Sequence, residues 1–145
     1  MQEVFILRAN ESDMKHILTT GLIAVVAFSS CNKDRNDHEV LTGRSWKMQQ
    51  QYMNGNDITH PCRQDDVYKF NDDGSFTLTN GPETCGAGEA TTLNGSWQLN
   101  PYGDRLNLVY PGNNITFEVI TISKDRMDLR YLTDTNTIRE VYIPN

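Results

Sequence analysis

From residue 40 to the C-terminus, apolar and polar side chains alternate in short runs, and glycine, asparagine, aspartate or proline separates each run from the next. Alternation with a period of two places successive side chains on opposite faces of an extended chain, so each run predicts a half-buried β-strand. The clusters between the runs, such as residues 54–57 and 71–74, predict tight turns. The predicted strands are residues 46–52, 68–70, 76–78, 95–99, 106–110, 115–122, 127–131 and 138–143.

Eight short strands with close connections indicate an all-β domain in which strands that follow each other along the chain pair antiparallel. An open sheet of this kind leaves two unpaired edges, and closure into a barrel removes both. We therefore predict an eight-stranded antiparallel up-and-down barrel over residues 40–145. A two-sheet sandwich is the alternative, because short connections are compatible with it as well.

An apolar run of twelve residues near the N-terminus, residues 17–28, carries no charge and follows the basic stretch 14–16. It is shorter than the roughly 20 apolar residues that a membrane-spanning helix needs. A basic start, an apolar segment of this length and a pair of small residues after it are typical of a secretory signal peptide. We therefore assign residues 1–30 to a signal peptide. Residues 1–13 precede Met14 and are acidic, which indicates a mis-assigned start codon, with a genuine longer n-region as the alternative.

The four residues 28–31, Phe-Ser-Ser-Cys, resemble the lipobox of bacterial lipoproteins, in which a diacylglyceryl group is attached to the cysteine thiol. The resemblance implies that Cys31 carries the acyl chains, palmitate among them, and anchors the mature protein to a membrane. Plain secretion is the alternative. Residues 31–39 have no periodic apolar position and predict a flexible tether, with at most a short helical turn at residues 38–42.

The charge balance narrows the choice of partners. The chain has 13 basic and 19 acidic side chains and a net charge of −6. A nucleic-acid partner would require a basic patch, so this class is excluded. A net negative charge keeps a domain soluble beside a membrane, and we expect a monomer.

The predicted hairpin at residues 68–78 fixes a register that reaches two cysteines. If Phe70 lies opposite Phe76, then Gly74 supplies the left-handed position of a three-residue loop. Extending the ladder brings position 62 opposite position 84. In an exported protein this predicts a disulfide between Cys62 and Cys85, with two free thiols or half a metal site as the alternatives.

Three segments resemble the lipocalin-like domains of Gram-negative cell-envelope lipoproteins. They are residues 41–47 (LTGRSWK), the hairpin at residues 68–76 (YKFNDDGSF) and residues 95–99 (GSWQL). The resemblance covers roughly residues 40–145. It implies a barrel on an outer-membrane lipoprotein, on the periplasmic face or the cell surface, and the binding of a small molecule.

The same resemblance implies that an arginine on a late strand covers Trp46 and closes one end of the barrel, with Arg130 or Arg139 as the candidate. If the barrel holds a ligand, polar groups on an otherwise apolar lining would orient it. Gln50, Tyr52, Tyr68 and Tyr110 are the predicted lining positions. A barrel filled by its own side chains is the alternative.

No pattern in the sequence predicts catalysis, a cofactor or a metal ion. His60 is the one histidine within residues 40–145, and no G-x-S-x-G motif accompanies it. Asp65 and Asp66 are adjacent, so an extended chain would point them to opposite faces. We therefore predict a protein that is not an enzyme.

Two hypotheses on function remain open. The first is a lipid-anchored module that binds a small apolar or amphipathic ligand without chemistry. The second is a filled barrel that contacts or inhibits another envelope protein through its loops, above all the glycine-containing loop at residues 79–92.

Overall fold

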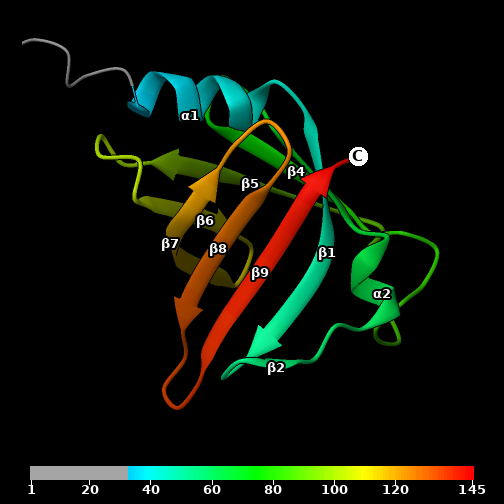
Figure 1. Cartoon of the computed structure of the whole chain (residues 1–145). Coiled ribbons are helices and arrows are strands. Elements are labelled where there is room, and N and C mark those ends of the chain that lie inside the picture. The colour runs from blue at the N-terminus through cyan, green and yellow to red at the C-terminus, as the bar shows by residue number, and fades with distance from the viewer. Residues whose placement is uncertain (1–32) are drawn as a thin grey trace, which may run out of the picture. The chain divides into compact units, whose positions relative to one another are not determined.

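The alternating runs of the sequence form strands, as Figure 1 shows for the computed structural model, which describes residues 33–145. The described part contains two helices, α1 (Lys33–Thr42) and α2 (Pro61–Gln64). Its strands are β1 (Ser45–Met53), β2 (Asn56–Asp57), β3 (Val67–Phe70), β4 (Ser75–Thr79), β5 (Thr92–Leu99), β6 (Arg105–Tyr110), β7 (Asn113–Ile122), β8 (Met127–Leu132) and β9 (Thr137–Pro144). The predicted signal peptide, residues 1–30, and Cys31 lie outside the described residues.

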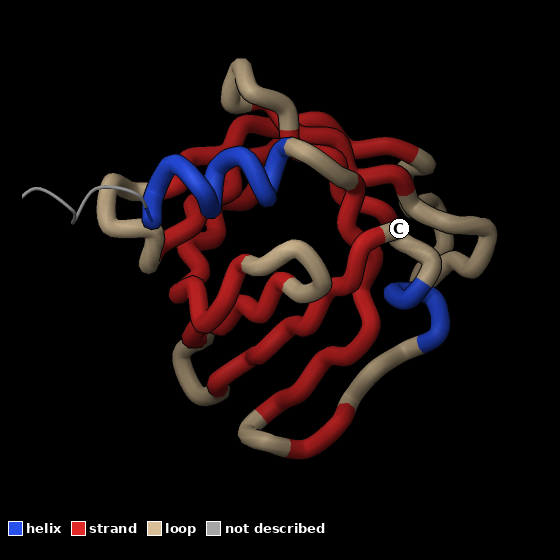
Figure 2. The backbone as a smooth tube through the Cα atoms, turned by 45° about the horizontal axis from the view of Figure 1, so that its top comes forward, coloured by secondary structure: helices blue, strands red, loops and turns tan. Residues whose placement is uncertain are grey.

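The strands close into a barrel. From β3 to β9 each strand pairs antiparallel with the next, β1 pairs with β3 on one side, and β1 also pairs with β9, which joins the two edges of the sheet. The two-residue β2 only extends the far end of β1. Figure 2 shows the resulting ring of strands. The predicted eight-stranded antiparallel barrel is therefore confirmed, and the sandwich is not formed.

The hairpin between β3 and β4 has the predicted register. Phe70 pairs with Phe76 and Tyr68 pairs with Leu78. Gly74 has a φ of 80°, the left-handed conformation that the loop requires and that glycine adopts without a steric cost. Phe70 and Phe76 therefore face the barrel interior together, as the alternation predicts.

One end of the barrel is closed by α1. Leu41, in the last turn of this helix, is completely buried, and its carbonyl oxygen accepts a hydrogen bond of 3.0 Å from the indole Nε1 of Trp46. The ring of His38 packs against Trp97 at a centroid distance of 5.1 Å. The prediction of a flexible tether at residues 31–39 is wrong for residues 33–39, which belong to α1. The sequence of these residues shows no apolar periodicity, because only the last turn of the helix supplies apolar side chains to the core.

Close packing inside the barrel depends on a glycine. A Cβ atom at Gly95 would lie 2.5 Å from the ring of Phe76 and 2.4 Å from the carbonyl oxygen of Val109. Gly95 on β5 therefore lets the ring of Phe76, on β4, lie flat across the neighbouring strand. Around it, the buried core at the closed end includes Trp46, Met48, Phe70, Trp97, Leu106, Leu108, Phe117, Met127 and Leu129.

We call the opposite end of the barrel the mouth. The connections at residues 54–66, 80–91, 111–112 and 133–136 all lie there. Several inward-facing side chains near the mouth keep partial exposure, although Leu78, Ile138 and Glu140 are buried there. At the closed end most inward-facing side chains are buried, and Leu99 and Val119 are partly exposed. We use "lumen" for the space that the partly exposed residues near the mouth face: Tyr68, Leu93, Tyr110, Ile115 and Tyr131.

Neither of the two helices in residues 33–145 has the length and apolarity to cross a membrane.

Candidate ligand-binding site

A β-bulge in β1 decides which of its side chains reach the lumen. Met48 pairs with Tyr142 but Gln50 pairs with Val141, so Gln49 is an extra residue between them. A one-residue shift exchanges the two faces of a strand. Beyond the bulge Gln51 faces inward, while Gln50 and Tyr52 face outward. The prediction that Gln50 and Tyr52 line a ligand site is therefore wrong, because it extended a strict alternation through the bulge.

Glu140 on β9 places a carboxylate inside the barrel. Its side chain faces the interior with that of Tyr142, and only 7% of the residue is exposed. The Tyr142 hydroxyl donates a hydrogen bond of 2.6 Å to Oε2, and Nε2 of Gln51 donates one of 2.9 Å to Oε1. Burial raises the pKa of Glu140 above its ordinary value, although these two hydrogen bonds oppose the rise.

Three further tyrosines surround this carboxylate. Tyr68, Tyr110 and Tyr131 face the interior, and within the described residues their hydroxyl groups have no hydrogen-bond partner. Burial raises the pKa of all three phenols, that of Tyr131 to about 12, and the charge of Glu140 adds to each rise. The hydroxyl groups are therefore neutral at physiological pH and can donate or accept a hydrogen bond. Tyr68 and Tyr110 lie on the face that the sequence predicts for them.

The tyrosines of the interior pack against other aromatic rings. Tyr68 contacts Tyr142 edge to face at 5.6 Å between centroids. Tyr110 contacts Phe76 in the same manner at 6.2 Å, and Tyr131 contacts Phe117 at 5.1 Å. Edge-to-face contacts of this kind hold each ring in one orientation, so the hydroxyl groups occupy defined positions.

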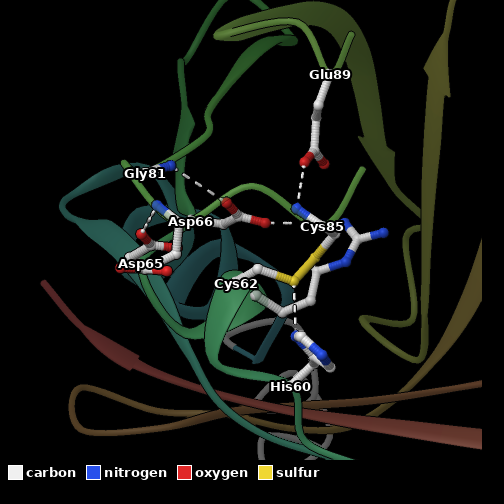
Figure 3. Close-up of a disulfide and its surroundings, with 9 residues drawn as sticks. His60, Cys62, Asp65, Asp66, Gly81, Cys85 and Glu89 are labelled. Carbon is white, nitrogen blue, oxygen red and sulfur yellow. Dashed lines mark hydrogen bonds and ion pairs between the residues drawn. A yellow bond between two sulfur atoms is a disulfide. The ribbon is translucent and has the colours of Figure 1, made fainter. Parts of the chain in front are cut away.

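A disulfide fastens the mouth. Cys62, in α2, is joined to Cys85, in the loop between β4 and β5, with a Cα–Cα distance of 5.3 Å (Figure 3). This confirms the predicted pairing. The same loop is held by two neighbouring carboxylates, since the side chain of Asp65 accepts a hydrogen bond from the amide of Glu83 and that of Asp66 accepts one from the amide of Gly81.

The charges at the mouth are mostly acidic. Arg63 of α2 lies 3.7 Å from a carboxylate oxygen of Asp66, and this arginine side chain is 44% exposed. Burial raises the pKa of Asp66, and the nearby carboxylates of Asp65 and Glu89 add to the rise. One arginine therefore faces three carboxylates at the rim of the lumen.

One group at the mouth has the composition of a metal site. Nδ1 of His60 lies 2.9 Å from Sγ of Cys62, and the ligand atoms of His60, Cys62 and Cys85 lie within 4.8 Å of one another. A metal ion binds a cysteine as its thiolate, whereas both sulfur atoms here belong to a disulfide. The oxidised protein therefore offers a single metal ligand in this group, His60.

The arginine that covers Trp46 is Arg44, whose guanidinium carbon lies 5.9 Å from the ring centroid. The prediction that Arg130 or Arg139 does so is wrong, because both residues lie on the outer face of the barrel and Trp46 faces inward. Arg130 forms an ion pair of 2.7 Å with Glu118. Arg139 lies over the ring of Tyr52 at 5.8 Å.

The outer face also has two hollows, of about 440 and 520 Å³, on either side of Arg130. A row of residues in register crosses them: Arg105, Glu118, Arg130, Arg139 and Tyr52. Two of the three arginines of the row are paired within the protein, since Glu118 binds Arg130 and Asp128 binds Arg139 at 2.6 Å, although Asp128 also binds Arg126. The lumen, by contrast, presents hydroxyl groups that no described residue binds, and it is the stronger candidate site.

A closed antiparallel barrel with one capped end and a polar group of residues inside the open end defines a class of ligand-binding barrels. The lipocalin-like domain family matches residues 41–129, and the chain belongs to this family. Lipocalin-like domains are generally binding proteins rather than enzymes. No curated protein matches the chain.

A solved structure supports the same fold. The crystal structure of a DUF4847 family protein from Bacteroides vulgatus superposes with a TM-score of 0.55 at 11% sequence identity. The match covers 74% of this chain and 96% of that chain. At this identity the likeness shows the shared fold.

Proposed function

We propose that this protein binds a small amphipathic molecule in its lumen without chemical conversion. The observation that carries the proposal is the set of unpartnered hydroxyl groups of Tyr68, Tyr110 and Tyr131 around the Glu140 carboxylate. These hydroxyl oxygens are not among the fully buried atoms that lack a hydrogen-bond partner. A ligand that reaches them would exchange their contact with water for direct hydrogen bonds, and these bonds would fix its orientation.

The rest of the lumen favours the apolar part of such a ligand. Leu93 and Ile115 stand beside the tyrosines and are partly exposed. Ligand sites commonly combine apolar walls with a few convergent polar groups, which fix the orientation of the ligand. A purely apolar ligand would leave the polar groups unpaired, so the distribution supports an amphipathic one.

Native mass spectrometry of the protein purified from its own envelope tests this proposal. We expect a population that carries a bound small molecule under gentle conditions. Leu93→Trp, which fills the mouth with a larger side chain, should reduce this population, and Val109→Trp on the outer face is the matched control, since Val109 is exposed. Bare protein throughout would contradict ligand binding and favour the second hypothesis, contact with another envelope protein through the loop at residues 79–92.

We also propose that the protein is an outer-membrane lipoprotein anchored through Cys31. The support is the sequence alone: the apolar run, the small residues after it and the cysteine that follows. Incorporation of radiolabelled palmitate tests the anchor, with Cys31→Ala as the control. Label on the wild type and not on the variant is the expected result, and an unlabelled wild type would contradict it.

A further inference from the structure

Glu140 is an isolated carboxyl group inside the barrel. The inward-facing positions of the described strands otherwise carry apolar, aromatic or amide side chains, and Glu140 is the one carboxylate or amine among them. Its two hydrogen-bond donors, Tyr142 and Gln51, are neutral. A buried carboxylate without a counter-charge is costly, and proteins normally pair such a group or keep it protonated.

Within the described residues, the interior supplies no cation for Glu140. Arg63 at the rim is the one cation that influences it, and Arg63 is paired with Asp66 and partly exposed. Arg139, next to Glu140 on β9, does not neutralise the carboxylate, because its side chain points outward. The same holds for Arg130, which pairs with Arg139 in the sheet and also points outward. Glu140 is therefore neutral when it holds a proton, and when it is ionised its counter-charge has to come from outside the described chain.

The walls around Glu140 suit a cation as well. Tyr68, Tyr110, Tyr131 and Tyr142 lie close enough to Glu140 for its charge to raise the pKa of each phenol. The face of an aromatic ring attracts an ammonium group, and the attraction strengthens when water is removed. A carboxylate among four tyrosines therefore offers an opposite charge with aromatic rings nearby, a combination that an organic ammonium prefers.

The rim directs cations toward the lumen. Asp65, Asp66 and Glu89 lie close enough together to influence one another, and Arg63 offsets only one of the three charges. A cleft with an excess of one sign raises the local concentration of the opposite ion and its association rate. Access through this mouth is more favourable for an amine than for a carboxylate of the same size.

We propose that the lumen selects organic amines, with the ammonium group of the ligand beside Glu140 and its apolar chain toward Leu93 and Ile115. The inference rests on the proposed function, because it names the class of ligand that occupies the same site. A protonated amine would pair with a carboxylate oxygen and with the tyrosine hydroxyl oxygens, which accept hydrogen bonds as well as donate them.

Isothermal titration calorimetry with a matched panel tests the proposal. Octylamine, octan-1-ol and octanoate have the same chain and differ only in the head group. At pH 7.5 we expect octylamine to bind at least tenfold more tightly than the other two. Glu140→Gln keeps the size of the side chain and removes the charge. It should weaken the binding of octylamine about 30-fold or more, since loss of a buried charge partner has an effect of this size.

Two controls separate the interpretations. Glu118→Gln removes an exposed carboxylate from the outer face and should leave octylamine binding unchanged. Tyr131→Leu removes one ring at the mouth without touching Glu140, and it should weaken octylamine more than octan-1-ol. It also tests the site independently if Glu140→Gln fails to fold.

The outcomes distinguish selectivity for amines from ligand binding in general. If octan-1-ol or octanoate binds as tightly as octylamine, or if Glu140→Gln keeps full affinity for octylamine, the amine inference is overturned and ligand binding in the lumen stands. If no member of the panel binds and the native protein carries no small molecule, the proposed function falls and the inference falls with it.

Discussion

Nε2 of Gln51 and Oε1 of Glu140 are joined by a hydrogen bond of 2.9 Å across the seam where the first and last long strands of the barrel meet. The bond exists because the bulge at Gln49 turns Gln51 inward. Closure of the barrel and placement of the interior carboxylate therefore depend on the same local irregularity. Without the bulge, Gln50 and Tyr52 would face the interior, and Gln51 would point outward, away from Glu140.

Glu140 should make stability depend on pH. Burial raises its pKa in the folded protein, so between the unfolded and folded pKa values the folded state binds more protons. The free energy of unfolding then falls as pH rises through that window, by about 1.4 kcal/mol for each unit of the shift. Urea denaturation of the ligand-free protein from pH 4 to pH 8 should show Glu140→Gln gaining stability relative to the wild type as pH rises.

The matched comparison is Glu118→Gln, whose carboxylate is exposed and paired with Arg130. We expect its stability relative to the wild type to stay nearly constant above pH 5. If the difference in free energy of unfolding between Glu140→Gln and the wild type is the same at every pH, the burial of Glu140 has no effect on its titration.

The disulfide should contribute measurably to stability. Cys62 and Cys85 are 23 positions apart, and closing a loop of this size is worth about 3 kcal/mol. The double variant Cys62→Ser, Cys85→Ser should lose this amount in urea denaturation. A reducing agent should destabilise the wild type and leave the double variant unaffected, and equal sensitivity of both proteins would speak against the bridge.

The space at Gly95 should tolerate no side chain. A methyl group would collide with the ring of Phe76 and with the backbone of β6, and overpacking of this kind costs about 1–3 kcal/mol. Thermal unfolding of Gly95→Ala should show this loss. Gly86→Ala is the control, because nothing lies within 4 Å of the Cβ position there, and its melting temperature should match that of the wild type.

Helix α1 should behave as part of the folded barrel. Leu41 in its last turn is fully buried, and truncation of a buried leucine to alanine costs about 2–5 kcal/mol. Leu41→Ala should lower the denaturation midpoint accordingly, while Asn36→Gln on the exposed side of the helix should change stability by less than about 0.5 kcal/mol. An unchanged midpoint for Leu41→Ala would mean that the segment acts as a tether.

Much of the fold could be predicted from the alternation and from single turn residues. Phe70, Phe76 and Gly74 fixed one hairpin, and that register led to the correct pairing of Cys62 with Cys85. The mistakes came from features that alternation does not encode. A bulge leaves no mark in a run of three glutamines, so the faces of Gln50 and Tyr52 were exchanged.

The candidate site was only half predictable for a related reason. Tyr68 and Tyr110 lie on simple alternating strands and were placed correctly on the inner face. Glu140 was missed although the sequence has a signal for it, since Arg139 and Glu140 are adjacent on one strand and one of the two must face inward. The burial of Asp66 was not predicted, because it depends on a loop that is distant in sequence.

The disulfide between α2 and the loop after β4 bears on when the mouth of the barrel is completed. The disulfide joins the two segments that carry Asp65, Asp66 and Glu89, and disulfides form in compartments outside the cytosol. Under the proposed export through the signal peptide, the bridge would form only after the chain leaves the cytosol, and the ligand proposed for the lumen would be bound there.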